Sequence, residues 1–311
     1  MSIATQISRL QTAKSSLKTA IEAKGVTVPS TAKLDTYDTY VSQIVTGGTS
    51  TTPSAFTSWE FDDWGKATNI VVKNGQTTIQ EHWQEQNKAL TACTLPNTIT
   101  AIGNYSFANC SNLSTLHITT ACTTLGTSAL SNIGTLAKHF DVSDINLGGI
   151  VPSTSFASIF NSSYLKGTLT IPNNCFSNAN SGYTTTMYQF LYNVHTNGSN
   201  SLTVDAYCDG VIIPRSCFHA YYLSNNSDGV NIRIHGTPSF LSAQSFSTSS
   251  GGSITFVDCT TPPDGAATGS TTSSTSPFYG NLGTIYVPSS GLSAWQTKYS
   301  GFSSKIKAIG T

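Results

Sequence analysis

The chain has 311 residues, enough for one large domain or two to three ordinary ones, and its formal net charge at pH 7 is zero. Charged residues make up only 10% of the sequence, far below the roughly 25% of a typical soluble protein, and Ser and Thr are the main polar residues instead. A neutral chain has no long-range field toward nucleic acid or anionic membranes, so we expect no nucleic-acid binding.

Residues 3–21 predict an amphipathic helix that stops before Pro29. Lys14 occupies the one position of its heptad seam that is not apolar. The apolar seam residues are Ile3, Ile7, Leu10, Leu17 and Ile21. A second, shorter helix is predicted from four further residues at 3-4-3 spacing: Leu34, Tyr37, Val41 and Ile44.

Two short helices with narrow apolar stripes are marginal on their own and need a partner. They could pack as a hairpin on the rest of the chain, but we favour self-association or docking onto another protein. Isoleucine at both seam positions favours a homotrimer over a dimer. We therefore predict an anchoring and oligomerisation segment at residues 1–46 and a Gly/Ser/Thr/Pro linker at 47–55, followed by a separate domain at 56–311.

The start of that domain predicts a β-strand. Residues 69–72 are apolar and β-branched, and they lead into an Asn74-Gly75 turn after which residues 77–79 could return as a hairpin. The acidic residues nearby, Glu60, Asp62 and Asp63, lie among aromatic residues and are interpreted as a solvated turn.

Seven cysteines are distributed along the same domain without a Cys-x-x-Cys pair: Cys93, Cys110, Cys122, Cys175, Cys208, Cys217 and Cys259. This pattern is typical of neither a disulfide framework nor a zinc module. We expect buried, reduced thiols and folding in a cytosol. We also expect no membrane insertion and no Sec-dependent export, because no apolar run approaches the required length.

Residues 95–118 combine a turn, a short helical or irregular arm at residues 105–108 and a short strand in about 24 residues. Such a unit cannot bury its own apolar edge and must stack on copies of itself. Degenerate copies recur at residues 171–178 and 213–220, where Pro is followed four residues later by Phe. We expect strands at 168–171, 210–213, 229–235, 253–258 and 285–287.

Residues 95–118 resemble the BspA-type leucine-rich repeat. They reproduce its Leu-Pro, Ile-Gly, Phe, Cys and Leu-x-x-Leu-x-Ile positions, and depart from it only in Ser106, where alanine is usual. The C-terminal residues resemble the terminal cap of such arrays, with a helix at 290–300, Ser290 as its N-cap, and Leu292, Trp295 and Tyr299 on one face. The resemblance implies an α+β, mainly β fold: an N-terminal helical anchor, a degenerate repeat solenoid and a C-terminal cap.

Residues 7–44 resemble a short segment found at the start of virion and tail-associated or fibre proteins of bacteriophages that infect gut bacteria. This resemblance implies a segment that attaches the protein to a capsid or tail protein, with the repeats displayed outward. It implies assembly in host cytoplasm, release by lysis and a location in the virion.

Enzyme motifs for nucleophilic hydrolysis, dinucleotide or phosphate binding and zinc proteolysis do not occur, so we expect no enzyme, no cofactor and no metal site. A glycan depolymerase remains an alternative if carboxylates such as Asp205, Asp209 and Asp228 converge in a groove.

We therefore expect a non-enzymatic virion fibre or appendage on a head or tail. Its repeat domain would bind a host-surface glycan or protein through aromatic side chains, for which the candidates are Tyr183, Tyr188, Tyr192, Tyr221 and Tyr222. The same tyrosines could instead pack over the solenoid. The alternatives to a fibre are a secreted bacterial adhesin and an assembly partner that leaves before maturation.

Overall fold

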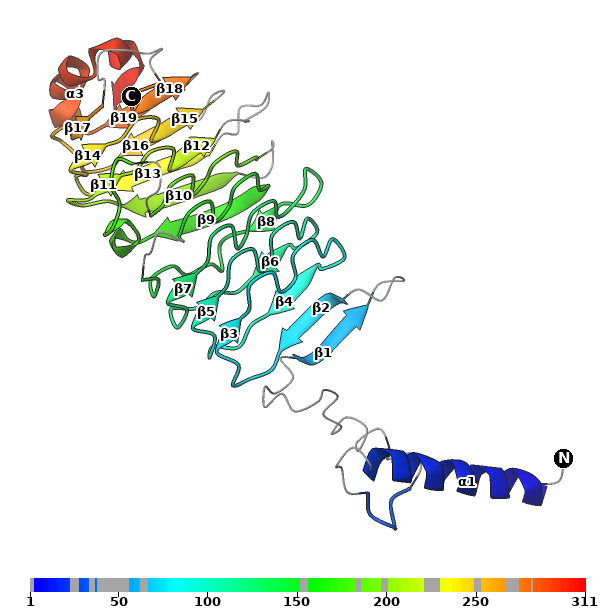
Figure 1. Cartoon of the computed structure of the whole chain (residues 1–311). Coiled ribbons are helices and arrows are strands. Elements are labelled where there is room, and N and C mark those ends of the chain that lie inside the picture. Colours follow the sequence, from blue (N-terminus) through cyan, green and yellow to red (C-terminus); the bar gives the residue numbers. More distant parts are fainter. Residues whose placement is uncertain are drawn as a thin grey trace. The chain divides into compact units, whose positions relative to one another are not determined.

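The structure is a computed structural model in which the chain forms two compact units, Met1–Ala55 and Phe56–Thr311 (Figure 1). We call them the helical unit and the repeat unit. The structure describes residues 3–22, 28–33, 37, 56–61, 67–151, 156–182, 186–196, 201–220, 230–248, 253–266, 274–280 and 282–311.

The helical unit contains α1 (Ile3–Glu22), a helix where the sequence predicts one. Four buried residues form its small core: Ile21, Val28, Ala32 and Tyr37. The chain after the helix is held against it by Lys18, whose Nζ donates a hydrogen bond to the Val28 carbonyl oxygen at 2.7 Å. Of the second predicted helix, Leu34, Val41 and Ile44 lie outside the described residues.

An eleven-stranded sheet runs the length of the repeat unit. Its strands follow chain order, and all neighbours are parallel except the antiparallel pair of β1 and β2. In order, the strands are β1 (Phe56–Phe61), β2 (Ala67–Val72), β4 (Ala92–Thr94), β6 (Thr115–Leu116), β8 (Phe140–Asp141), β9 (Leu165–Ile171), β10 (Leu202–Tyr207), β13 (Asn231–His235), β16 (Ile254–Phe256), β19 (Ile285–Val287) and β20 (Ile306–Ala308).

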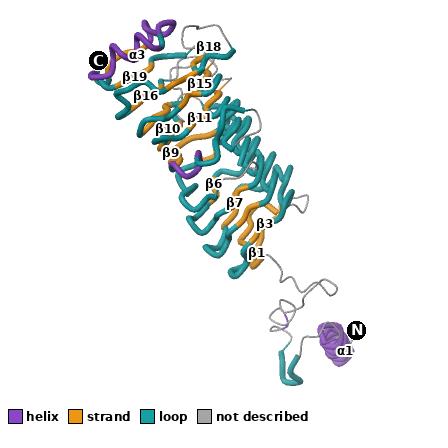
Figure 2. The backbone as a smooth tube through the Cα atoms, turned by 60° about the vertical axis from the view of Figure 1, so that its left-hand side comes forward, coloured by secondary structure: helices purple, strands orange, loops and turns teal. Residues whose placement is uncertain are grey.

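Three small parallel sheets line other sides of the stack (Figure 2). The first comprises β3 (Thr78–Ile79), β5 (Ala101–Ile102) and β7 (Thr124–Leu125). The second comprises β11 (Ile212–Ile213), β14 (Phe240–Leu241) and β17 (Asp264–Gly265). The third comprises β12 (Phe218–Ala220), β15 (Phe246–Thr248) and β18 (Phe278–Gly280).

The expected hairpin after Asn74-Gly75 is wrong. The chain does turn there, but β3 pairs in parallel with β5 of the next coil instead of returning along β2. On its outer edge, β2 pairs in antiparallel with β1, the strand that precedes it. In a stack of coils each strand pairs with the equivalent strand of the next coil, so a turn within one coil leads to a different sheet.

The early coils repeat every 23 residues. The Thr91, Thr100 and Thr123 hydroxyls each donate to the backbone carbonyl of a residue 23 positions earlier. These bonds use the hydroxyl-rich surface to join consecutive coils. Later coils vary in length. Thr168 of β9 pairs with Thr203 of β10, 35 residues later, whereas Ile232 of β13 pairs with Ile254 of β16, 22 residues later.

The Ile-Gly position of the repeat is a point of close approach between coils. A Cβ atom on Gly103 would lie 2.5 Å from the Glu81 backbone nitrogen, and one on Gly126 would lie 2.5 Å from that of Asn104. A side chain at either position would push the coils apart, which explains why the repeat has glycine there.

The arm around Tyr105 is a stacked turn and contains no helix. Tyr105 and Asn109 have positive φ angles of 55° and 63°, and the same left-handed conformation recurs at Ser128 and Asn132 of the next coil. The Tyr105, Phe107 and Asn109 amides all donate to carbonyls of that next coil. Bonding between coils thus compensates a conformation that is uncommon outside glycine.

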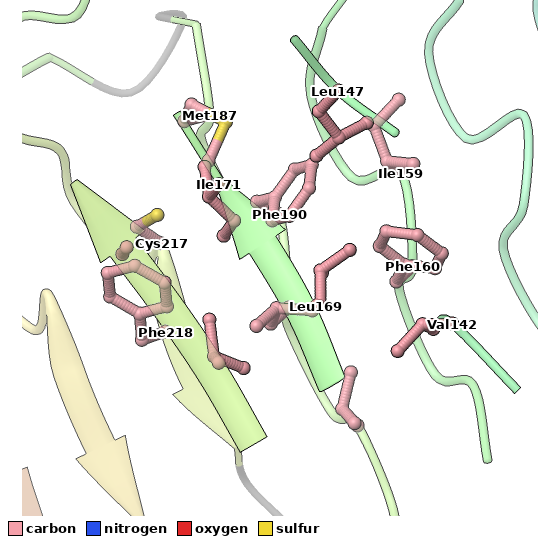
Figure 3. Close-up of a cluster of buried hydrophobic side chains, with 14 of the residues drawn as sticks. Val142, Leu147, Ile159, Phe160, Leu169, Ile171, Met187, Phe190, Cys217 and Phe218 are labelled. Carbon is pink, nitrogen blue, oxygen red and sulfur yellow. The ribbon is translucent and has the colours of Figure 1, made fainter. Parts of the chain in front are cut away.

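The core runs continuously through the repeat unit. In Figure 3, Leu169 and Ile171 of β9 lie beside Phe190, which stands near Phe160 of the preceding coil. The Phe190 ring centroid is 5.4 Å from that of Phe156 and 5.5 Å from that of Phe160. Successive coils therefore share one core, and none has a core of its own.

The C-terminal end is closed by η3 (Ser289–Gly291), α3 (Leu292–Lys298) and η4 (Ser300–Lys305). A further short helix, η2 (Asn173–Phe176), lies within the stack. The Trp295 and Tyr299 side chains are buried, and they donate hydrogen bonds to the carbonyls of Cys259 at 3.0 Å and Pro263 at 2.9 Å.

The expectation that Ser290 caps α3 is wrong. Ser290 lies inside η3, and Gly291 occupies the N-cap position without a side-chain hydrogen bond. The chain enters α3 through a 3-10 turn, so the first helical residue comes two positions later than the serine.

Candidate binding surfaces

The apolar seam of α1 is only partly covered. Ile21 is 1% exposed in the helical-unit core, whereas Ile7, Leu10 and Leu17 are 50%, 60% and 39% exposed. Lys14 interrupts the seam, and its Nζ lies 6.0 Å from the centroid of the Tyr37 ring. The side chain of Ile3 lies outside the described residues. We call Ile7, Leu10 and Leu17 the exposed stripe.

Of the five tyrosines predicted to bind a ligand, the structure describes two. Tyr183, Tyr221 and Tyr222 lie outside the described residues. Tyr188 and Tyr192 are half-buried on the turn side of the coils, where their carbonyls accept hydrogen bonds from the Ser158 and Ser162 amides. The Tyr192 ring lies 4.9 Å from that of His219 in the next coil, so this ring packs between coils.

A different group of side chains meets on the outward face of the main sheet, across β10 and β13. Asp205 pairs in register with Arg233, and Tyr207 pairs with His235. Asp205 Oδ1 lies 3.0 Å from His235 Nε2 and 3.3 Å from Arg233 Nε. The Tyr207 ring stacks on the His235 ring at 4.6 Å and 15°. We call these four residues the outward cluster.

From the sequence, Asp205 is expected only as a possible catalytic acid, and β10 is not predicted, so the cluster is not expected either. The strand nevertheless alternates strictly between buried residues and outward polar residues, the buried ones being Leu202, Val204 and Ala206. That alternation was the available signal. The register that brings Arg233 and His235 beside Asp205 arises 28 residues later along the chain, at a coil length that the sequence does not specify.

An open hollow of about 500 Å³ lies next to this cluster, on the β8 and β9 side. Thr170 of β9, which pairs in register with Asp205, lines it. Its other polar lining residues are His117, Ser143, Asp144 and Asn146. Pro172, immediately after β9, also lines it.

The carboxylates proposed for a depolymerase have other partners. Asp205 belongs to the outward cluster, Asp209 Oδ1 accepts a hydrogen bond from the Thr237 amide at 3.1 Å, and Asp228 lies outside the described residues. Among the residues that the structure describes, no group of His, Cys, Asp and Glu could hold a metal ion.

All seven cysteines are buried with free thiols, as expected. Burial raises the pKa of the Cys110 and Cys175 thiols to about 12, so the reactive thiolate is suppressed. The cysteine side chains pack in the apolar core of the repeat unit.

Two histidines are buried in the same unit. Burial, and then the charge of Arg215, lower the pKa of His219 to about 4. Burial also lowers the pKa of His139, with smaller contributions from Lys166 and His195.

Residues 49–159 match the BspA type leucine rich repeat region in six copies. The resemblance seen in residues 95–118 is thereby confirmed, and repeats of this type suggest a surface or adhesin-type protein. The parallel ladder continues well beyond the matched residues, to β20. A comparison with curated proteins finds no match.

None of the helices in the described part of the chain has the length and hydrophobicity needed to cross a membrane.

Proposed function

We propose that the protein is a non-enzymatic structural component of a bacteriophage virion, a fibre or appendage on a head or tail. Its helical unit attaches and oligomerises the protein, and its repeat unit displays a surface that binds the host. The exposed stripe on α1 carries this proposal.

Three large exposed apolar side chains along one helix are costly to leave in water, because burying each would contribute roughly 1.5–3 kcal/mol. Their heptad spacing is the spacing by which helices associate. The repeat unit completes its own core, so it needs no such partner for folding. A stripe of this kind supports assembly, and the resemblance of residues 7–44 to phage virion proteins supports attachment to a particle.

The assembly is tested by light scattering after size separation, using the full chain and a chain that starts at Ser50. We expect a trimer for the full chain and a monomer for the shortened chain. Leu10→Asp should also dissociate the full chain, because it places a charge in the stripe. Ser15→Asp, on another face of α1, is the matched control and should leave the trimer intact. A full chain that is monomeric at all concentrations would contradict self-assembly.

Attachment is tested with the phage that encodes the chain. Deleting residues 1–48 should remove the protein from purified particles while the remaining domain stays folded. Normal incorporation of the shortened protein would contradict attachment through the helical unit, and absence of the intact protein from particles would favour a transient assembly partner.

A cell-surface adhesin is the second candidate, because the BspA-type repeat region favours it directly. The two candidates differ in location. Antibodies against the repeat unit should label purified particles if the protein is a virion component, and the surface of intact bacteria if it is an adhesin.

A further inference from the structure

The outward cluster lies among polar side chains on the main sheet face. The residues around it in register also have polar side chains: Thr168 and Thr170 on β9, Thr203 on β10 and Asn231 on β13. The fold does not require this composition, since the core-facing residues of the same strands already supply the packing.

Asp205 is a fixed hydrogen-bond acceptor. Its side chain is only 18% exposed, and both of its partners approach the same oxygen, Oδ1. Within the described residues Oδ2 has no partner. A carboxylate oriented by two donors, with its second oxygen available, is ready to accept hydrogen bonds from a ligand without first losing conformational freedom.

Tyr207 is a fixed aromatic surface. It is 46% exposed, and stacking on His235 holds its ring in place. Ala206 pairs with Ile171, so the next residue of that coil, Pro172, follows at the neighbouring position and lines the hollow. The Tyr207 position is thus next to that of Pro172, which lines a hollow whose volume lies in the range of small-ligand sites, roughly 300–1,000 Å³.

The charges around the site include no excess of cations, since Asp144 lines the hollow in addition to two acid–base pairs. Asp141 pairs with Lys166 at 3.8 Å, and Asp205 pairs with Arg233. Such a face has no excess of cations for a sulfated, sialylated or phosphorylated polymer. The hollow is lined in part by Ile145, Leu147 and Pro172, but it is open, so it is not the fully buried pocket that a protein partner's anchor residue fills.

We infer that the outward cluster and the adjoining hollow bind a neutral glycan. A sugar ring has an apolar C–H face that can stack on Tyr207, and hydroxyl groups that can donate to Asp205 Oδ2 and accept from the Arg233 guanidinium. The hollow would accommodate the neighbouring sugar unit. This inference deepens the proposed host-binding role and rests on it for its biological setting, although the binding itself can be measured independently.

The test uses the labelled full chain on a printed array of neutral hexose and N-acetylhexosamine oligosaccharides, with sialylated and sulfated oligosaccharides on the same array. We expect binding to a subset of the neutral oligosaccharides, followed by titration calorimetry with the best of them. Tyr207→Ala and Asp205→Asn should each weaken that binding at least about tenfold.

Tyr105→Ala is the matched control, since Tyr105 is also an exposed tyrosine stacked on a histidine, His82 at 5.2 Å, but lies on the turn side of the unit and should leave affinity unchanged. Tryptophan fluorescence of each variant verifies folding, and Tyr207→Phe, which keeps the ring, should retain binding if Tyr207→Ala proves unfolded. Binding to no glycan, binding only to sialylated or sulfated glycans, or affinity that is insensitive to Tyr207 and Asp205 would overturn the inference. A monomeric chain that binds neutral glycans would remove the assembly proposal and leave this one intact, whereas a trimer that binds none would do the reverse.

Discussion

The helical unit and the repeat unit differ in how completely they bury their apolar side chains. In the helical unit, four residues form the core and most of the α1 stripe remains exposed. In the repeat unit, each coil covers the apolar edge of the previous one, and the cap closes the last. The apolar stripe of α1 needs a partner from outside the helical unit. The apolar edge of a coil, in contrast, is covered by the next coil of the same chain.

The two units also differ in composition, which makes the comparison measurable. All the histidines, cysteines, phenylalanines and tryptophans of the chain lie beyond Ala55. Tryptophan fluorescence, thiol reactivity and histidine titration therefore report on the repeat unit alone.

The largest effect is expected from Phe190→Ala. Phe190 is fully buried between Phe156 and Phe160, so its truncation should lower the free energy of unfolding by about 3–5 kcal/mol. Urea unfolding followed by tryptophan fluorescence measures this. Tyr37→Ala, in the helical-unit core, is the control and should leave the same transition unchanged. An equal loss for both variants would mean that the two units unfold together.

Acid should destabilise the repeat unit. The pKa of His219 is about 4 in the folded protein and about 6.5 when unfolded, so between these values only the unfolded chain binds the proton. Stability from neutral His219 is thus complete above pH 6.5, falls by about 3 kcal/mol as the pH drops to 4, and is constant below it.

Urea unfolding at a series of pH values measures this slope. His219→Gln should flatten it, while His117→Gln, which changes an exposed histidine on the main sheet, should not. An unchanged slope in the His219 variant would show that other groups dominate the acid response.

Thiol labelling should be slowed in the folded protein. All seven cysteines are buried, and suppressed thiolate formation adds to their inaccessibility. Reaction with a chromogenic disulfide at pH 8 should be about a hundredfold slower than in denaturing guanidinium chloride. A rapid native phase of one or more thiols would locate a coil that opens locally, and mass spectrometry would identify it.

The smallest effect concerns Ser106, which stands where alanine is usual in the repeat. Its Oγ lies 2.7 Å from the carbonyl oxygens of Gln80 and Gly103, so the hydroxyl joins two coils inside the core. Ser106→Ala should cost about 1 kcal/mol in urea unfolding. Ser303→Ala, at an exposed serine, should cost nothing measurable. A neutral Ser106 variant would mean that packing alone sets this position.

Several features of the repeat unit were readable before the structure. Residues 95–118 carried the repeat, and the strand at 285–287 is found with its predicted bounds as β19. The failures share one cause. The predicted return strand at residues 77–79 and the missing β10 both concern strands whose partners lie in another coil, and the sequence of one coil does not specify those partners.

The candidate site likewise depends on pairing between coils that the sequence does not specify. The tyrosines chosen from the sequence were aromatic residues in insertions, and Tyr192 proved to pack against His219 between coils. The outward cluster depends on the pairing of β10 with β13, which joins residues 28 positions apart. Spacing within one strand can indicate which side chains face outward, but not which strand lies next to it.

The amino-acid sequence by itself determined the local properties: the α1 stripe, the 23-residue repeat of the early coils and the apolar identity of the cysteines. These follow from the spacing and chemistry of neighbouring residues. Tertiary structure decided which polar side chains meet on the sheet face and which strands of neighbouring coils pair. Those outcomes depend on the register between coils, which is fixed only when the whole stack shares one core.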